Sequence, residues 1–304
     1  MVHETIYLYE GRADVTLTTY VLSDSGEMLA GKGRPAVLIC PGGAYLACSD
    51  REAEPIAMAF AVMGYHAFVL RYSVYGGEAF DNKFAGMTPR EECRYPAPMR
   101  EIGLAMLSIK EHAKQWLVDA DRIAICGFSA GAHNCAMYAT HWHMPVITDY
   151  FGRDKDLFRP AACILAYCIS DYLYMREHAD RHSGAKDLFD AANLSYLGRK
   201  EVSEEQLAEV SPVRFVTEEM PPTFLWTTAE DEVVPVQHSI RMAHALADSG
   251  VPFELHIFEE GRHGLSLATQ ASSGCKTQIN KDAAKWIGLA DAWLHKRFAI
   301  EFEN

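Results

Sequence analysis

The sequence predicts the α/β fold class, with a doubly wound, mostly parallel sheet covered by helices on both faces. The main observation is that short apolar runs of strand length alternate with segments in which apolar residues recur at helical spacing. This alternation is typical of parallel βαβ units. The composition agrees, because 304 residues with 49% hydrophobic and 23% charged side chains are expected to form a globular core, not a disordered or collagen-like chain.

The predicted strands are of two kinds. Apolar residues alternate at Val15, Leu17 and Val21, which is typical of an antiparallel strand over residues 15–22. We therefore expect antiparallel strands at the N-terminal end of the sheet. The later runs are continuously apolar, as in buried parallel strands, and they cover residues 36–40, 67–70, 123–126, 162–169, 223–227 and 253–258.

Helices are predicted between these strands. Ser49 or Asp50 can cap a helix that ends at Met63, where Gly64 follows as a stop signal. Apolar residues between positions 102 and 117 share one helical face. Further helices are expected after residue 130, around residues 240–246 and over residues 286–294.

Two segments interrupt the alternation. Residues 171–222 are mixed and rich in polar side chains, and we interpret them as an insertion at the top of the sheet. The sequence thus predicts a single domain over residues 1–304 with a short cap insertion at about 172–221. Residues 75–95 are irregular and rich in glycine and charge, and long loops of this kind in a compact domain are usually functional or mobile.

Charge and hydropathy limit the partners and the location. The 28 basic residues against 41 acidic ones give a net charge of −13, which argues against a nucleic-acid partner. No apolar run reaches about 18 residues, the length expected of a membrane span. The first residues lack the basic stretch and apolar core of a signal peptide. We therefore expect a cytoplasmic protein that does not insert into a membrane.

The cysteines and histidines give no metal or disulfide pattern. Most of the eight cysteines lie in apolar runs and none forms a C-x-x-C pair, so we expect buried free thiols. The pairs His141/His143 and His178/His182 lack a third ligand at a diagnostic spacing. We expect no metal and no cofactor.

Residues 127–131 read Gly-Phe-Ser-Ala-Gly, a G-x-S-x-G motif. The motif directly follows a predicted strand and precedes a predicted helix, which is the context of a nucleophile elbow. The glycines are needed because the sharp turn leaves no room for neighbouring side chains. The turn would hold the Ser129 hydroxyl above the sheet edge, at a helix N-terminus that favours developing negative charge. The alternative is a plain glycine-lined turn.

A serine needs a base to become a nucleophile, and in this kind of sheet the expected order is Ser, Asp or Glu, then His. His263 follows the last predicted strand, and Asp231 follows the strand before it. Asp231 would hold His263 in one tautomer and stabilise the imidazolium. Glu230 is the main alternative for this acid, and Glu232 is a further rival.

Backbone N–H groups are expected to bind the developing oxyanion. The loop after the predicted strand over residues 36–40 supplies Gly43 and Ala44, and Ala130 next to the nucleophile supplies a third N–H. Tyr45 beside this loop could line the substrate site or only wedge the loop in place. The sequence leaves the two roles open.

Together these segments resemble the α/β-hydrolase esterases, in the branch of acetyl-xylan-esterase-like and feruloyl-esterase-like enzymes related to the hormone-sensitive lipase family. The resemblance implies the α/β-hydrolase fold, a Ser129/Asp231/His263 triad and hydrolysis of short acyl esters, often acetyl groups on carbohydrates. This chain has alanines at 44 and 132 where the family usually has glycine. Alanine keeps its N–H, and the added methyl groups would narrow the acyl pocket. The segments that carry the resemblance are 41–45 (PGGAY), 54–57 (EPIA), 70–72 (LRY), 95–98 (YPAP), 127–133 (GFSAGAH), 231–235 (DEVVP) and 263–264 (HG).

The leading hypothesis is a serine carboxylester hydrolase that releases short acyl groups, acetyl above all, through an acyl-enzyme. Its partner would be a small-molecule ester such as an acetylated oligosaccharide. One alternative is a serine peptidase of the prolyl-oligopeptidase type, which usually carries a large extra domain that 304 residues do not accommodate. Another is a binding protein on a hydrolase fold, but such a protein would be expected to lack one of the three residues. A homodimer is compatible with the sequence.

Overall fold

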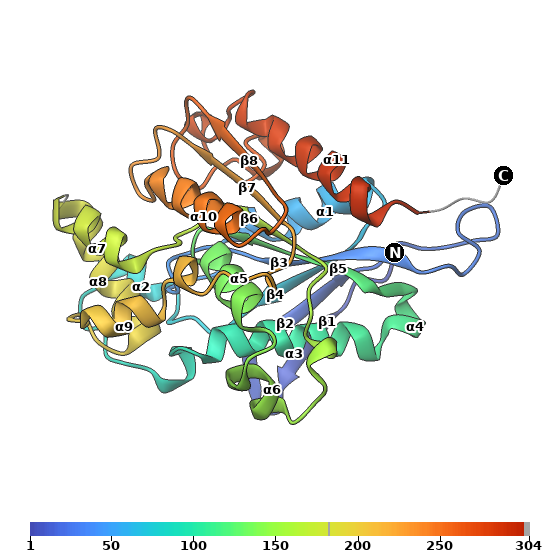
Figure 1. The fold of residues 1–304 in the computed structure, drawn as a ribbon, viewed down its shortest axis with the longest axis horizontal. Helices are drawn as coiled ribbons and strands as arrows, with labels where there is room; N and C mark the ends of the chain where they lie inside the picture. The colour runs from blue at the N-terminus through green and yellow to red at the C-terminus, as the bar shows by residue number, and fades with distance from the viewer. Residues whose placement is uncertain (182, 301–304) are drawn as a thin grey trace.

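A computed structural model describes residues 1–181 and 183–300 (Figure 1). In this part of the chain, eight strands form one sheet in the order β1-β2-β4-β3-β5-β6-β7-β8. The β1–β2 and β2–β4 pairs are antiparallel and all later pairs are parallel. This confirms the predicted fold class. The strands are β1 (Thr5–Tyr9), β2 (Arg12–Tyr20), β3 (Arg34–Cys40), β4 (His66–Arg71), β5 (Val118–Phe128), β6 (Ala162–Ala166), β7 (Thr223–Thr228) and β8 (Phe253–Phe258).

Helices connect the strands and cover the sheet. The longer ones are α1 (Glu54–Val62), α3 (Ala97–Glu111), α5 (Ala130–His141), α7 (Tyr172–Arg181), α8 (Ser183–Leu197), α10 (Gln237–Asp248) and α11 (Trp286–Phe298). The shorter ones are α2 (Glu78–Asp81), α4 (Ala113–Trp116), α6 (Pro145–Phe151) and α9 (Glu204–Glu209). Single 3₁₀ turns are η1 (Asp50–Glu52), η2 (Glu91–Cys93), η3 (Lys155–Leu157), η4 (Pro212–Arg214), η5 (Gln270–Ser272), η6 (Lys276–Gln278) and η7 (Ala283–Lys285).

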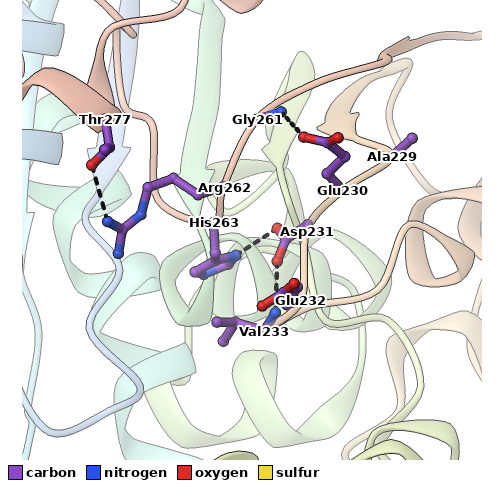
Figure 2. A pocket seen from close by; sticks show the side chains of 9 residues that line it. All are labelled: Ala229, Glu230, Asp231, Glu232, Val233, Gly261, Arg262, His263 and Thr277. Carbon is purple, nitrogen blue, oxygen red and sulfur yellow. Dashed lines mark hydrogen bonds and ion pairs between the residues drawn. The ribbon is translucent and has the colours of Figure 1, made fainter.

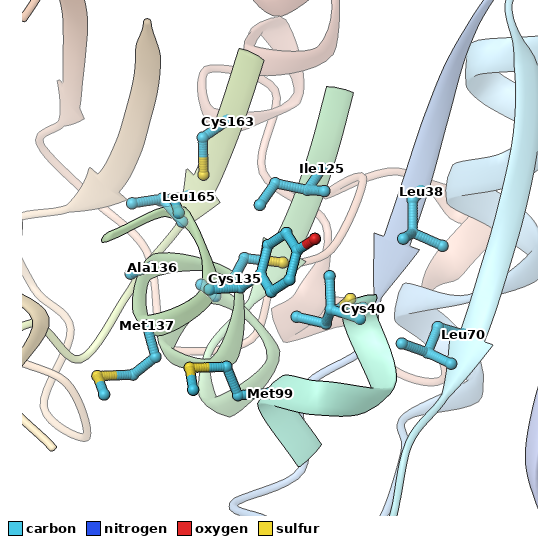
Figure 3. Close-up of a cluster of buried hydrophobic side chains, with 14 of the residues drawn as sticks. Leu38, Cys40, Leu70, Met99, Ile125, Cys135, Ala136, Met137, Cys163 and Leu165 are labelled. Atoms are coloured by element: carbon cyan, nitrogen blue, oxygen red, sulfur yellow. The ribbon is translucent and has the colours of Figure 1, made fainter. Parts of the chain in front are cut away.

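The core is divided by the sheet because successive strand residues point to opposite faces. On one face Leu38 and Ile125 pack with residues of α3, α5 and α10. Figure 3 shows part of this layer, where Met99 of α3 and Met137 of α5 lie over the strands. On the other face Val37 and residues of its neighbouring strands pack with α1 and α11. Both faces of the sheet are therefore buried, as doubly wound sheets require.

Several predicted boundaries were wrong. The helix expected up to Met63 is split into η1 and α1, because the backbone leaves the helical region at Ala53 and Pro55 then occupies the first turn of α1. The helix expected to reach Leu117 breaks after α3, and Leu117 itself has a left-handed φ of 53°. The strand expected to reach residue 169 ends at Ala166, because Tyr167 has a left-handed φ of 38°.

The predicted insertion contains α7, α8, α9 and η4, which lie between β6 and β7. In Figure 1 these helices project from one end of the sheet. The segment 75–95 contains α2 and η2, and the guanidinium of Arg90 lies 4.1 Å from the ring centre of Tyr75. All eight cysteines are free thiols, and Cys275 is the exposed one. Within the described residues, no helix is long and apolar enough to cross a membrane.

Candidate active site

Ser129 occupies the turn between β5 and α5, with a left-handed φ of 51° and a ψ of −119°. The flanking glycines permit this strained turn. A Cβ on Gly127 would lie 2.3 Å from the Gly131 carbonyl oxygen, and one on Gly131 would lie 2.1 Å from the Cys40 carbonyl oxygen. No side chain fits at either position. The turn places the Ser129 hydroxyl at the N-terminus of α5, where the helix dipole favours negative charge.

The structure brings together the three residues that the sequence singled out. His263 Nε2 lies 2.8 Å from Ser129 Oγ, and His263 Nδ1 lies 2.7 Å from Asp231 Oδ2. Asp231 follows β7 and His263 follows β8, so adjacent strand ends deliver both side chains to one edge of the sheet (Figure 2). With Asp231 accepting at Nδ1, the imidazole presents Nε2 to the serine hydroxyl as a proton acceptor.

In the described part of the chain, the hydrogen bonds of the rival acids do not include His263. Glu230 accepts a hydrogen bond from the Gly261 N–H at 3.2 Å (Figure 2). Glu232 contributes its backbone carbonyl oxygen, which lies 3.0 Å from His178 Nε2. Asp231 is therefore the acid of this loop that contacts His263.

The electrostatics of His263 favour proton uptake. Its side chain is 16% exposed and that of Asp231 is 1% exposed. Burial alone disfavours the charged imidazolium, but the charge and hydrogen bond of Asp231 outweigh it, so the pKa of His263 is raised above its ordinary 6.5. A group with these contacts can take a proton from a serine hydroxyl and later return it.

The loop after β3 runs from Pro41 to Tyr45 beside the serine. Gly43 has a left-handed φ of 133°, and a Cβ there would lie 2.2 Å from the Ala47 carbonyl oxygen. The Gly42 N–H donates to Glu52 Oε2 at 2.8 Å. In the described part of the chain, the N–H groups of Gly43, Ala44 and Ala130 meet no backbone or side-chain acceptor. These three donors are therefore available to a ligand.

Tyr45 is buried and fixes this loop. Its hydroxyl donates to His133 Nδ1 at 2.6 Å, and His133 Nε2 donates to the Val210 carbonyl oxygen at 2.8 Å. Burial lowers the pKa of His133 to about 4, so the ring is neutral. The Tyr45 ring stacks on Tyr196 of α8, with ring centres 4.0 Å apart. Tyr45 also borders the small cavity beside Ser129, so it both wedges the loop and lines the cavity.

Two pockets border Ser129 and His263. The first has a volume of about 50 Å³, is apolar, and borders Ser129 together with Met175 of α7 and Leu188 of α8. The second is an open groove of about 750 Å³ that borders His263 and contains Glu230, Glu232, Arg262 and Thr277 (Figure 2). Val233 lines both. The arrangement therefore offers a small apolar space near the serine and a larger, more open polar space near the histidine.

The histidine pairs considered as metal ligands do not form a site in the described residues. No group of three or more His, Cys, Asp or Glu side chains there could hold a metal ion. His141 lies 2.8 Å from the Met137 carbonyl oxygen through Nδ1. His182 lies outside the described residues.

Sequence reasoning missed Glu52, which is buried next to the loop after β3. It lies in a short run of charged residues with Arg51 and Glu54, and such runs usually face solvent. Nothing in that local pattern separates it from an exposed acid.

The chain matches the BD-FAE family over residues 29–246, a range that includes Ser129 and Asp231 and ends before His263. It is 32% identical over 241 residues to endo-1,4-beta-xylanase B of Butyrivibrio fibrisolvens, covering 77% of this chain and 33% of that protein. It is 24% identical over 236 residues to esterase LipQ of Mycobacterium tuberculosis (strain ATCC 25618 / H37Rv), covering 74% and 48%. The chain thus spans between a third and a half of the length of these relatives.

Solved structures share the whole fold. The carboxylesterase Cest-2923 from Lactobacillus plantarum WCFS1 is 27% identical, with a TM-score of 0.80 and 100% of both chains covered. The acetyl ester-xyloside bifunctional hydrolase from Caldicellulosiruptor lactoaceticus is 26% identical, with a TM-score of 0.73 and 96% of both chains covered. MGS-M1, an α/β hydrolase from a Medee basin deep-sea metagenome library, is 31% identical, with a TM-score of 0.72 and 99% of both chains covered. The chain belongs to the BD-FAE family and has the α/β-hydrolase fold.

Proposed function

We propose that the protein is a serine carboxylester hydrolase that works through an acyl-enzyme. The observation that carries this proposal is the pair of hydrogen bonds that joins Ser129 to His263 and His263 to Asp231. Ser129 is the nucleophile, His263 the general base and acid, and Asp231 the group that orients the imidazole. The esterases and carboxylesterases among its relatives support the reaction class.

The geometry suits both halves of the reaction. Ser129 Oγ attacks the ester carbonyl while His263 Nε2 takes the hydroxyl proton, and the N–H groups of Gly43, Ala44 and Ala130 bind the carbonyl oxygen as it becomes negative. His263 then gives the proton to the departing alcohol, leaving an acyl-serine. Water repeats the sequence on the acyl group, which leaves as a carboxylic acid and restores the serine.

The size of the apolar cavity supports a short acyl group. The cavity of about 50 Å³ beside Ser129 is much smaller than the groove of about 750 Å³ beside His263, so we expect acetyl and propionyl groups to fit it better than longer chains, which would need α7 and α8 to move. These helices belong to the insertion at about 172–221, which we assign as a cap on a single domain. One solved relative is an acetyl ester-xyloside hydrolase, which makes acetylated carbohydrates the first class of substrate to test.

The open groove beside His263 supports a polar alcohol. Because His263 protonates the leaving alcohol, the alcohol must lie near that ring. The groove supplies the carboxylates of Glu230 and Glu232, the Arg262 guanidinium and the Thr277 hydroxyl, which are groups that hydrogen-bond to sugar hydroxyls. The cytoplasmic location and the homodimer stay predictions from the sequence.

Covalent labelling tests the serine mechanism. The protein is treated with a fluorophosphonate probe and digested, and the labelled peptide is identified by mass spectrometry, with Ser129→Ala as the blank. We expect one label per chain, on Ser129, and none in the variant. Absence of the label, together with no ester turnover, would contradict the proposal. A label on Ser129 with no ester turnover but with cleavage of an aminoacyl-proline amide would favour the serine peptidase. Neither label nor cleavage would favour a binding protein.

A further inference from the structure

Glu52 is a buried carboxylate, 4% exposed, at the end of η1. Its Oε2 accepts the Gly42 N–H at 2.8 Å and its Oε1 accepts the Tyr167 hydroxyl at 2.6 Å. These two donors are a backbone amide and a neutral phenol, so neither of them is a cation. Burying a carboxylate costs free energy that its hydrogen bonds must offset, so Glu52 depends on these two donors. Both of its donors adjoin the candidate active site.

The first donor connects Glu52 to the loop after β3. A Cβ on Gly42 would lie 2.8 Å from Glu52 Oε2 and 2.9 Å from the Cβ of Ser129. Only a glycine therefore allows the carboxylate and the serine to approach the same backbone so closely. Gly42 directly precedes Gly43 and Ala44, so the hydrogen bond from its N–H to Glu52 restrains the start of the segment that carries their N–H groups.

The second donor connects Glu52 to the base. The Tyr167 ring meets the His263 ring edge to face, with centres 5.0 Å apart. The Tyr167 hydroxyl also accepts the Ser266 N–H at 3.1 Å, three residues after His263. Burial and the Glu52 carboxylate raise the pKa of Tyr167 well above 10, so the hydroxyl remains a donor to Glu52.

The residue before Glu52 strengthens the same connection. Arg51 donates to the Gly264 carbonyl oxygen at 2.9 Å and to the Ser272 carbonyl oxygen at 2.7 Å. The Ser266 hydroxyl donates back to the Arg51 carbonyl oxygen at 2.5 Å. The turn η1 therefore holds the segment after His263 at several points while Glu52 holds the loop after β3.

We propose that Glu52 is a positioning residue for the proposed ester hydrolysis, which this inference presupposes. It fixes the oxyanion-binding loop through Gly42 and the flank of His263 through Tyr167, and its negative charge favours the imidazolium that forms during the reaction. The charged groups that act on His263 are Asp231, Glu52 and Arg262. Glu52 contacts none of the reacting atoms, so it acts through its two donors and through its charge.

Replacing Glu52 by glutamine removes the charge and keeps the shape. We expect Glu52→Gln to lower kcat by about 10 to 100-fold with little change in KM, which is less than the roughly 10² to 10³-fold loss on removing an oxyanion-hole donor itself, because Glu52 acts on the donors indirectly. The acid limb of kcat/KM should move to lower pH, because Asp231 and Glu52 both raise the pKa of His263. The matched control is Glu54→Gln, which removes the same charge from an exposed residue two positions on and should leave kcat and the pH profile unchanged.

Tyr167→Phe keeps the charge and removes one donor. We expect it to lower kcat without moving the acid limb. If Glu52→Gln does not fold, as judged by circular dichroism and Tm, the kcat of Tyr167→Phe tests the positioning role of Glu52. A folded Glu52→Gln with wild-type kcat, or a folded Tyr167→Phe with wild-type kcat, would overturn the proposal.

Titration of His263 by NMR separates this inference from the proposed function, because it needs no turnover. The His263 signal is assigned with a His263→Gln variant. A lower His263 pKa in Glu52→Gln supports the connection even if no ester is hydrolysed, in which case only the proposed function fails. An unchanged His263 pKa in the folded variant would refute the role of the charge.

Discussion

Asp231 uses its two carboxylate oxygens for different tasks: Oδ2 lies 2.7 Å from His263 Nδ1, whereas Oδ1 accepts the N–H groups of Val233 and Val234 at 3.0 and 2.8 Å. The backbone of its own loop therefore holds the Asp231 carboxylate in one orientation. This carboxylate in turn orients the His263 imidazole toward Ser129. This relationship distinguishes Asp231 from the acids on either side of it.

Asp231→Asn should abolish most activity. The amide can keep the shape of the side chain, but it cannot stabilise the imidazolium and can hold the wrong tautomer of His263. We expect kcat to fall by about 10³ to 10⁴-fold, the scale of this substitution in serine hydrolases, with Tm close to that of the wild type. The measurement is steady-state hydrolysis of p-nitrophenyl acetate.

The control for that experiment is Glu230→Gln, which removes the neighbouring charge. Glu230 accepts a single N–H from Gly261, and p-nitrophenyl acetate has no sugar hydroxyls for its carboxylate to bind, so with this substrate we expect kcat to change by less than about 3-fold. If Glu230→Gln were as damaging as Asp231→Asn, the assignment of the orienting acid would have to be changed.

The pH profile should reflect the raised pKa of His263. The base is active when neutral, so kcat/KM rises as pH increases through the pKa of His263. Because Asp231 outweighs the effect of burial and raises that pKa, we expect the midpoint to lie above the value of about 6.5 for an unperturbed histidine. Asp231→Asn should lower the midpoint of whatever activity remains. A wild-type midpoint below 6 would contradict this electrostatic description.

Leu188→Ala should lengthen the accepted acyl chain. Leu188 of α8 lines the cavity of about 50 Å³ beside Ser129, and removing most of its side chain opens space toward the cap. For the wild type we expect kcat/KM on p-nitrophenyl esters to fall steeply after propionate, and for Leu188→Ala we expect the fall to begin after butyrate or later. An identical profile in the two proteins would show that the acyl group binds elsewhere.

Glu101→Gln should stabilise the protein at alkaline pH. Glu101 of α3 is fully buried, accepts the Ser73 N–H at 2.6 Å and contacts the Ser73 hydroxyl. Burial, opposed by these hydrogen bonds, raises its pKa from 4.5 to about 7. The native state thus keeps a proton that the unfolded chain releases, so stability falls as pH rises from 4.5 through 7.

The uncharged variant avoids this loss. At about 1.4 kcal/mol per pKa unit, the free energy of unfolding of the wild type falls by a few kcal/mol between pH 4.5 and a pH well above 7. The variant does not have this decrease. We expect the Tm of Glu101→Gln minus that of the wild type to increase between pH 5 and pH 8, as measured by differential scanning calorimetry. A difference that does not depend on pH would mean that Glu101 does not titrate in this range.

The positions of Ser129, Asp231 and His263 could be predicted because each follows a recognisable apolar strand. In a parallel sheet the ends of such strands meet at one edge, so order along the chain translates into proximity. The N–H groups of Gly43 and Ala44 follow from the same rule, since their loop comes directly after β3. The apolar strand pattern was therefore sufficient to place the main residues of the candidate site at one edge of the sheet.

The supporting contacts could not be predicted in this way. Tyr45 and His133 are 88 residues apart, and Glu52 and Tyr167 are 115 residues apart. Such pairs depend on how loops pack over the sheet, and no periodicity encodes that. The helix boundaries failed for a related reason, because a single left-handed residue such as Leu117 breaks an apolar pattern that otherwise continues.

The most direct test of the central claim is kcat/KM for p-nitrophenyl acetate with the wild type and with Ser129→Ala, measured side by side and corrected for spontaneous hydrolysis. We expect measurable turnover by the wild type and a loss of at least about 10³-fold in the variant, since the nucleophile cannot be replaced by a methyl group. Turnover by Ser129→Ala within a few-fold of the wild type would contradict the assignment of Ser129 as the nucleophile.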